Sequence, residues 1–331
     1  MQTKEVSVIG GGSWATAIVK ILSNQAEKIH WWMRDPDKAN YINKYLHNPR
    51  YLSSVQFEKE KLNVSTDLDE IISKSEYIVI ATPSAFLMDV FGDRDNKDLK
   101  DKIIISAVKG IVPEVHQIPA RFIHKRFGTP YERIGIISGP CHAEEVALER
   151  LSYLTVACQD QQIAADFASM LECRYIKTHI SDDLFGTELS AILKNIYAVA
   201  SGIFLGLGYG DNFQAVLISN AVQEIERFVD VLNPIHRDVK SSAYLGDLLV
   251  TAYSQFSRNR TFGNMVGKGY SVMSAQMEMN MTAEGYYAAK SIIKINDKFN
   301  VDIPIATAVY RILYEKISPA VEMRILADQL V

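Results

Sequence analysis

The feature that most constrains the fold is a glycine-rich turn near the start of the chain. An apolar run, Val6–Ile9, stops at Gly10-Gly11-Gly12, and helical periodicity follows over Ile18–Leu22. This strand–turn–helix order is the context in which a Gly-x-Gly-x-x-Ala loop holds a dinucleotide pyrophosphate. Gly10 permits the tight turn, and Gly12 lets the backbone approach phosphate beside unpaired helix N–H groups. The stretch predicts a Rossmann nucleotide-binding fold, with an ordinary glycine-rich turn as the alternative.

Length and composition indicate a two-domain globular protein. The chain has 331 residues, of which 48% are hydrophobic and 22% charged, so it can bury a large core. Its net charge of −4 gives no broad electrostatic reason to expect nucleic acid or an anionic membrane as a partner. Cys141, Cys158 and Cys173 have no metal-type spacing and cannot all pair, so we expect no metal site and a reducing compartment. With no signal-peptide pattern, the expected location is cytoplasmic.

The first half alternates short apolar runs with polar or helical segments. Apolar runs of this kind are typical of central strands covered on both faces, and helix-length connections predict right-handed crossovers. The expected fold class is α/β, with an N-terminal doubly wound parallel Rossmann sheet. The predicted strands are Glu5–Ile9, Lys28–Met33, Tyr77–Ala81, Ile103–Ala107, Ile134–Ile137 and Tyr153–Ala157.

From about Asp183 the pattern becomes helical. We predict N-caps at Asn212 and Ser242, and Pro304 in a first turn. The predicted division is an NAD(P)-binding Rossmann domain at 1–183 and an all-helical substrate-binding domain at 184–331. The predicted helices are Thr187–Leu205, Phe213–Leu232, Ala243–Phe256, Ala283–Lys294 and Ile305–Ile317.

Charged side chains follow two of the predicted strands. Arg34 and Asp35 stand where a Rossmann fold meets the adenine ribose. A carboxylate there suits NAD, whereas an arginine can pair with a 2′-phosphate, so NAD and NADP both stay open. A solvated charge pair is the alternative. Lys109 follows a buried strand and could reach a phosphate or a substrate oxygen, or be a solvated loop lysine.

Lys194 is the only charged side chain between Glu188 and Asp211. Placing an ammonium in so apolar a helix is costly without partners, and desolvation lowers the pKa toward the range useful for proton transfer. The segment also carries Asn195 and four glycines, which indicates a buried helix rather than a membrane span. A lysine that reaches solvent from the helix rim is the alternative.

A second apolar helix carries a line of polar residues. Asp247 and Thr251 lie four apart, and Ser254 and Arg258 follow after three and four more positions, on or near the same helical face. Asp247 is a natural partner for the isolated lysine, and Arg258 with Asn259 could hold a phosphate through a guanidinium fork and an amide. The alternative is a structural ion pair, with an arginine at the helix C-terminus.

Taken in order, six segments closely resemble the NAD(P)-dependent glycerol-3-phosphate dehydrogenases of the bacterial, soluble type. The resemblance covers the chain from about Val6 to Glu284. It implies a Rossmann domain, an all-helical substrate domain and usually a homodimer. It also implies reversible hydride transfer between dihydroxyacetone phosphate and sn-glycerol 3-phosphate with NAD or NADP, which supplies glycerophospholipid synthesis. The matching segments are Gly10–Ala17, Ser106–Gly110, Ser138–Val146, Leu193–Asn195, Gly246–Thr251 and Ser257–Arg260.

The resemblance implies residue roles as well. Lys194 would exchange the proton, and Asp247 would orient its ammonium. The expected dinucleotide contacts are Gly10, Gly12, Ser13, Trp14, Arg34, Lys109, Ala143, Arg258 and Glu284. The expected substrate contacts are Lys109, Gly139, Cys141, Lys194, Asp247, Ser257, Arg258 and Asn259.

The chain departs from the family pattern at three places. Ala15 replaces the commoner third glycine of the loop, and Cys141 stands where a hydroxyl residue is more usual. The segment Met277–Gly285 is unusual around its Glu-Gly pair.

Two other interpretations stay open. One is a related two-domain Rossmann dehydrogenase with a catalytic lysine that acts on 3-hydroxy acids or ketopantoate. The other is a non-catalytic sensor of the NAD(H) ratio, which needs no buried proton donor. Only the glycerol-3-phosphate dehydrogenase interpretation requires a phosphate on the substrate. For that interpretation we expect a small-molecule substrate as partner, with no nucleic acid and no membrane insertion.

Overall fold

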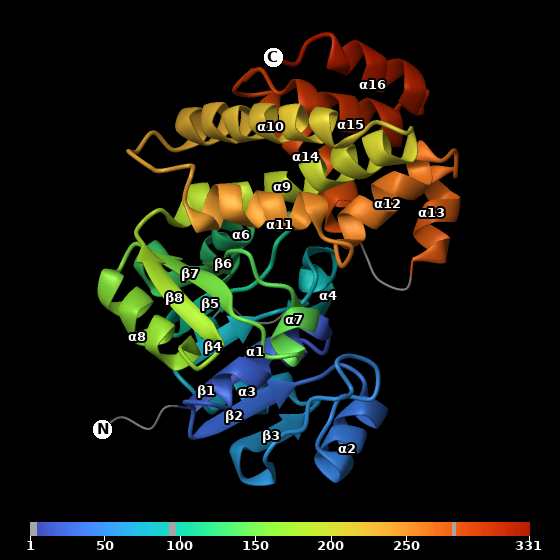
Figure 1. The fold of residues 1–331 in the computed structure, drawn as a ribbon. Helices are drawn as coiled ribbons and strands as arrows, with labels where there is room; N and C mark the ends of the chain where they lie inside the picture. Colours follow the sequence, from blue (N-terminus) through green and yellow to red (C-terminus); the bar gives the residue numbers. More distant parts are fainter. Residues whose placement is uncertain (1–4, 93–96, 280–282) are drawn as a thin grey trace. The chain divides into compact units, whose positions relative to one another are not determined.

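A computed structural model describes residues 5–92, 97–279 and 283–331. They form two compact units (Figure 1). The first extends to Thr82 and continues through Phe86–Val108 and Pro119–Leu184; the second comprises Pro83–Ala85, Lys109–Ile118 and Phe185–Val331. Two short segments of the N-terminal half therefore group with the helical unit. Residues 280–282, within the segment that departs from the family pattern, lie outside the described residues.

The first unit contains one eight-stranded sheet, with the order β3-β2-β1-β4-β5-β6-β7-β8. Neighbouring strands are parallel except β6 and β7, which are antiparallel. The strand order reverses between β1 and β4, which defines a doubly wound fold with its ligand-binding edge at that switch point. The predicted α/β Rossmann class is confirmed. The strands are β1 Glu5–Ile9, β2 Lys28–Trp32, β3 Leu62–Ser65, β4 Tyr77–Ile80, β5 Ile103–Ser106, β6 Ile134–Ser138, β7 Ser152–Cys158 and β8 Ile176–Ser181.

All six predicted strands are present, and two further strands occur. β3 has four residues, of which only Val64 is buried, and β8, at an edge of the sheet, has four polar residues among its six, so neither is a continuous apolar run. The connection from β6 to β7 contains the five-residue helix α7, Ala143–Ala147.

The helices of the first unit form two groups. Helix α1 contacts α7 and α8, whereas α5 contacts α3 and α6. Strands β1 and β5 between these groups are almost fully buried, as expected for a sheet covered on both faces. The helices are α1 Ser13–Leu22, α2 Pro36–Tyr45, α3 Leu68–Ser73, α4 Leu87–Phe91, α5 Lys97–Lys100, α6 Pro119–Phe127, α7 and α8 Gln161–Leu171.

The second unit is helical and has its own hydrophobic core. Its helices are α9 Leu184–Gly206, α10 Asp211–Leu232, α11 Asp247–Tyr253, α12 Arg258–Gly267, α13 Val272–Glu278, α14 Glu284–Asn296, α15 Pro304–Tyr314 and α16 Pro319–Ala327. The five predicted helical segments are present, with one of them divided. Its first part is a π-helical turn, Ser242–Gly246, and its second part is α11. Helices α12, α13 and α16 were not predicted.

Helix starts differ from the predictions at two of three positions. Helix α10 has Gly210 as its N-cap, and Ser241 precedes the π-helical turn, so the predicted caps Asn212 and Ser242 are wrong. An N-cap needs extended backbone, which Gly210 and Ser241 adopt, whereas the predicted residues lie inside the first turn. Pro304 occupies the first turn of α15 as predicted.

Helix α9 is the long apolar helix that carries the isolated lysine. Among the described residues it alone is long and apolar enough to cross a membrane, yet 89% of its most apolar window is buried within the protein. Ile192, Leu193 and Ile196 belong to the core of the second unit. The prediction of a buried core helix is confirmed.

Candidate active site

Two lysine side chains of the second unit bind one carboxylate. Lys194 of α9 donates from Nζ to Oδ1 of Asp247, which begins α11. Lys109 donates from Nζ to the other carboxylate oxygen, Oδ2, at 3.3 Å. The side chains of Lys194 and Asp247 are only 4% and 2% exposed, whereas that of Lys109 is 18% exposed. The predicted pairing of Lys194 with Asp247 is therefore present, and Lys109 joins it.

Burial sets the protonation of this cluster. Desolvation lowers the pKa of Lys194 to about 7, and the positive charge of Lys109 adds to that shift. The Asp247 carboxylate opposes it, because a nearby negative charge favours the ammonium. An amine that titrates near neutrality can both give and take a proton under physiological conditions.

Two glycines bring α12 against the helix that carries Lys194. A Cβ at Gly263 would overlap the carbonyl of Val199, and a Cβ at Gly202 would overlap the carbonyl of Arg260. Only glycine allows the two backbones to approach so closely. The start of α12, with Arg258 and Asn259, is thereby fixed beside the middle of α9.

The start of α12 corrects the predicted polar line. Helix α11 ends at Tyr253, and Ser257 is the N-cap of the separate helix α12, accepting from the Arg260 N–H at 3.3 Å. Arg258 is therefore the first residue of a new helix and not the last residue of the preceding one. Thr251 turns its hydroxyl back onto the Asp247 carbonyl. The polar residues thus come from two helices, and the signal for the break was Ser257, a good capping residue.

Two buried asparagines connect the segments around this cluster. Asn195 Nδ2 donates to the Lys109 carbonyl at 2.6 Å, and Asn259 Nδ2 donates to Asn195 Oδ1 at 2.9 Å. The Gly285 N–H donates to Asn259 Oδ1 at 2.9 Å. Asn259 was predicted as a substrate contact, but no role was predicted for Asn195. The signal that could have identified it is a second polar residue beside the isolated lysine of an apolar helix.

Glu284 is a buried carboxylate of the same unit. Ser84 donates to it from its backbone N–H at 3.1 Å and from its hydroxyl at 2.5 Å. Burial raises the pKa of Glu284, while the Ser84 hydrogen bonds and the positive charge of Arg258 oppose that change. A Cβ at Gly110 would overlap both the carboxylate and the Ser84 hydroxyl. Glu284 thus fixes the turn at Ser84, a residue for which no role was predicted.

The glycine-rich loop of the first unit has the geometry that its sequence predicts. Gly10 has φ +135°, and a Cβ there would meet the Ala81 carbonyl at 2.6 Å, so only glycine fits. A Cβ at Gly12 would meet no atom within 4 Å, which leaves open space at the N-terminus of α1. Asn48, for which no role was predicted, donates to the Gly11 carbonyl at 3.3 Å and to the Thr16 hydroxyl at 2.9 Å.

The other predicted dinucleotide residues of this region lie at the start of α1 and just after the end of β2. Ser13 is buried as the first residue of α1, and Trp14 is half-buried. Arg34 is exposed, with its guanidinium 5.4 Å from the centre of the Phe86 ring. Asp35 caps α2 by accepting from the Asp37 and Lys38 N–H groups, so it has a structural role, whereas Arg34 faces solvent.

Three predicted residues lie in the turn after β6, also in the first unit. Gly139 has φ +120°, and a Cβ there would meet the Tyr153 carbonyl at 2.7 Å. Cys141 and Ala143 are buried, and Ala143 begins α7. The absence of a side chain at Gly139 lets the turn pack against the backbone of β7.

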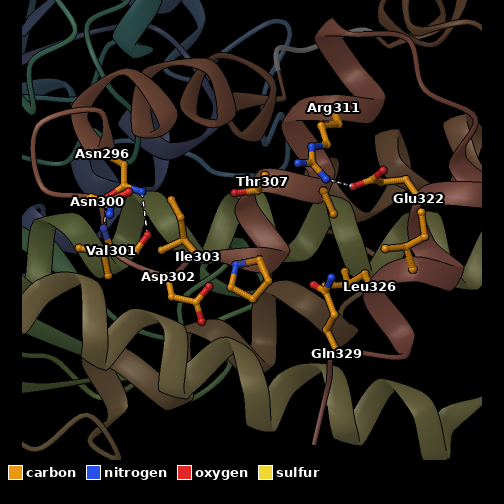
Figure 2. Close-up of a pocket in the computed structure, with 13 residues that line it drawn as sticks. Asn296, Asn300, Val301, Asp302, Ile303, Thr307, Arg311, Glu322, Leu326 and Gln329 are labelled. Carbon is orange, nitrogen blue, oxygen red and sulfur yellow. Dashed lines mark hydrogen bonds and ion pairs between the residues drawn. The ribbon is translucent and has the colours of Figure 1, made fainter.

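A separate pocket of about 500 Å³ lies in the second unit between α15, α16 and the chain that precedes α15 (Figure 2). Arg311 donates to Glu322 at 3.1 Å in its wall, and Asn296 makes two hydrogen bonds to the Val301 backbone. None of the predicted catalytic residues lines it. Its charged and amide groups hold the C-terminal helices together, so we assign the pocket no part in the reaction.

No group of three potential metal ligands occurs among residues 5–92, 97–279 and 283–331.

Known proteins of similar sequence and structure agree with this arrangement. The chain is 32% identical over 314 residues to glycerol-3-phosphate dehydrogenase (NAD(P)+) of Staphylococcus carnosus, covering 95% of this chain and 94% of that protein. It is similar to the crystal structure of glycerol-3-phosphate dehydrogenase from Coxiella burnetii, with TM-score 0.89, 28% identity and 98% of each chain covered. A ketopantoate reductase from Ralstonia eutropha shares the fold at TM-score 0.58 and 12% identity, covering 98% of this chain and 99% of that one.

A dinucleotide-type Rossmann unit combined with a helical unit that buries a lysine–carboxylate pair defines a two-domain dehydrogenase. Residues 5–164 match the NAD-dependent glycerol-3-phosphate dehydrogenase N-terminus, and residues 183–324 match the C-terminus of the same family. The chain belongs to the NAD-dependent glycerol-3-phosphate dehydrogenase family.

Proposed function

We propose that this protein catalyses the reversible, NAD(P)-dependent oxidation of sn-glycerol 3-phosphate to dihydroxyacetone phosphate. The observation that carries the proposal is the ammonium of Lys194, buried on Asp247 with a pKa lowered to about 7. A sensor of the NAD(H) ratio has no use for such a group. Family membership favours the phosphorylated triol over a 3-hydroxy acid or ketopantoate.

The first unit fits NAD or NADP. Open space lies beside Gly12, and the first turn of α1 contains no acidic residue that would repel a pyrophosphate. Gly10, Ser13 and Trp14 would hold the dinucleotide there, with exposed Arg34 near the adenine ribose. Lys109, Ala143, Arg258 and Glu284 complete the proposed set. When bound, the nicotinamide accepts hydride from the alcohol or delivers it to the ketone.

Lys194 moves the proton at the substrate oxygen. In the reductive direction its ammonium protonates the carbonyl oxygen as negative charge develops there, and in the oxidative direction its neutral amine takes the hydroxyl proton. Asp247 holds the amine in place and stabilises its charged form. Lys109 shares the carboxylate and keeps a second positive charge near the reacting oxygen.

The substrate phosphate is the other point of recognition. Arg258 offers a guanidinium at the start of α12, where the helix N-terminus also favours an anion. Asn259 and Ser257 lie beside it on the same turn. Gly139 and Cys141 are the proposed substrate contacts of the first unit. Binding energy from the phosphate then serves to position the reacting carbon.

We further propose that the enzyme is a cytoplasmic homodimer that supplies glycerophospholipid synthesis, and that residues 1–183 and 184–331 act as cofactor and substrate domains. The family resemblance supports these assignments. Light scattering on the purified protein should give about twice the chain mass of 37.2 kDa.

A spectrophotometric assay tests the function. We expect NADH or NADPH to be consumed with dihydroxyacetone phosphate, with no comparable turnover of dihydroxyacetone or ketopantoate. With NAD+ or NADP+ we expect oxidation of sn-glycerol 3-phosphate and no comparable oxidation of 3-hydroxy acids. Equal turnover of phosphorylated and phosphate-free substrates would refute the proposed substrate. Dinucleotide binding without oxidation of any small alcohol would favour the sensor.

A further inference from the structure

The two buried asparagines of the second unit form a short relay of hydrogen bonds. It runs from the Lys109 carbonyl through Asn195 and Asn259 to the Gly285 N–H, with distances of 2.6, 2.9 and 2.9 Å. Asn195 is 5% exposed and Asn259 is 8% exposed, so water does not compete freely for these groups. The relay joins the segment after β5 to three helices, α9, α12 and α14.

The two ends of the relay fix the orientation of both amides. The Lys109 carbonyl can only accept, so Asn195 must turn Nδ2 toward it and Oδ1 away. The Gly285 N–H can only donate, so Asn259 must turn Oδ1 toward it and Nδ2 away. The central contact is then Nδ2 of Asn259 to Oδ1 of Asn195, as observed. Turning either amide would bring like groups together and break two hydrogen bonds.

This fixed orientation determines what Asn259 offers a ligand. An amide nitrogen has two N–H groups, and one of them is bound to Asn195. The other has no acceptor among the described residues. An anionic phosphate oxygen needs a donor, whereas the amide oxygen of a turned Asn259 would repel it.

We propose that Asn195 is a positioning residue that fixes Asn259 as a hydrogen-bond donor to the substrate phosphate and holds the Lys109 backbone. It acts through these two neighbours and does not itself transfer a proton. This inference rests on the proposed function, since it assigns a further residue to phosphate recognition at the same site.

The Asn195→Leu variant removes the relay at nearly constant side-chain size. We expect the KM for dihydroxyacetone phosphate to rise about 10-fold or more, since Asn259 loses one of the two hydrogen bonds that fix its amide and keeps the one from the Gly285 N–H. The inhibition constant of inorganic phosphate should rise by a similar factor, and the KM for the dinucleotide should stay within about two-fold. Asn195→Asp keeps the acceptor for Asn259, so its KM should lie closer to that of the unmodified enzyme.

The matched control is Gln214→Leu. Gln214 is also buried and also exchanges two hydrogen bonds with α9, through Ser201. We expect this variant to lose stability without a change in KM. A rise in KM for Asn195→Leu no larger than that for Gln214→Leu would overturn the inference.

A double-mutant cycle with Asn259→Ala separates the relay from general loss of packing. The effect of Asn195→Leu on KM should largely disappear when Asn259 is already alanine, because the two residues act as one unit. Additive effects would overturn the relay. Failure of the unmodified enzyme to reduce dihydroxyacetone phosphate would instead overturn the proposed function, so the two failures are distinguishable.

Discussion

The second unit buries two ionisable clusters within one helical turn of each other on α9, and they differ in what surrounds the charge. Lys194 binds the side chain of Asp247. Tyr197, one turn further along, lies near Glu224, whose carboxylate accepts from the Ile305 and Ala306 N–H groups at 2.8 and 3.0 Å. Glu224 therefore caps α15 from a neighbouring helix, and its partners are fixed backbone groups.

Each cluster contains a group whose pKa is shifted toward neutrality, and burial is the main cause in both. Desolvation lowers the pKa of Lys194 to about 7 and raises the pKa of Glu224 to about 7, because burial disfavours whichever form is charged. A shifted pKa is therefore not sufficient to identify a catalytic group. The difference lies in the partners. Lys194 is joined through a carboxylate to the partly exposed Lys109, whereas Glu224 is occupied by the N-terminus of a helix.

The largest difference between the two clusters is expected when the Lys194 amine is removed. Lys194→Ala should lower kcat by about 10³-fold or more, since general acid–base catalysis typically contributes factors of about 10² to 10⁴. Stability should also fall, because the buried Asp247 carboxylate loses one of its two lysine partners. Stopped-flow or steady-state assays measure the first effect and urea unfolding the second.

Dinucleotide affinity is the control for Lys194→Ala. Fluorescence titration with NADH should give a Kd within about three-fold of that of the unmodified enzyme, because the glycine-rich loop belongs to the first unit. Turnover within an order of magnitude of normal would refute the assigned role.

A smaller loss of activity is expected when the Asp247 carboxylate is replaced. Asp247→Asn removes a charge-assisted hydrogen bond worth roughly 1.5–3 kcal/mol, so kcat should fall by about 10- to 100-fold. The pKa of Lys194 should fall further, because its charged form loses its counter-ion. The pH profile of the oxidative reaction should therefore move to lower pH. A shift to higher pH would contradict the assignment.

The smallest change in activity is expected when Glu224 of the second cluster is replaced. In Glu224→Gln, kcat should stay within about two-fold of normal, while the pH dependence of stability changes. The folded protein holds the Glu224 proton more tightly than the unfolded chain, with a pKa raised from 4.5 to about 7. This contribution to the free energy of unfolding is present below pH 4.5 and is lost as pH rises to about 7.

Urea unfolding of both proteins between pH 5 and 8 measures that difference. The unmodified protein should lose up to about 3 kcal/mol relative to Glu224→Gln over this range, at about 1.4 kcal/mol per pH unit. Parallel pH profiles for the two proteins would show that Glu224 does not titrate there. A fall in the kcat of Glu224→Gln beyond about ten-fold would contradict the purely structural role of Glu224.

The sequence predicted those features that depend on local pattern. Gly10 and Gly12 were recognisable because a tight turn between a strand and a helix needs glycine. Lys194 was recognisable because it is the only charged side chain between Glu188 and Asp211. The predicted strands were mostly continuous apolar runs. β3 was missed because it is short and largely half-buried, and β8 because most of its residues are polar.

What the sequence could not predict depends on distant parts of the chain. Lys109 and Asp247 are 138 positions apart, and their contact exists only because the segment after β5 groups with the helical unit. The proposed role of the Asn195 amide depends on its hydrogen bonds to Lys109 and Asn259, which the sequence does not show. The helical spacing of three and four residues from Asp247 to Arg258 suggested one helix, and the break at Ser257 appears only in the folded chain.

The central claim is that one buried amine with a lowered pKa exchanges the substrate proton. The pH dependence of kcat/KM measured in both directions tests it most directly. The reductive rate should fall above about pH 7 and the oxidative rate should fall below about pH 7, with a common midpoint set by Lys194. Profiles that are flat through this range in both directions, or a midpoint that persists in Lys194→Ala, would contradict the account.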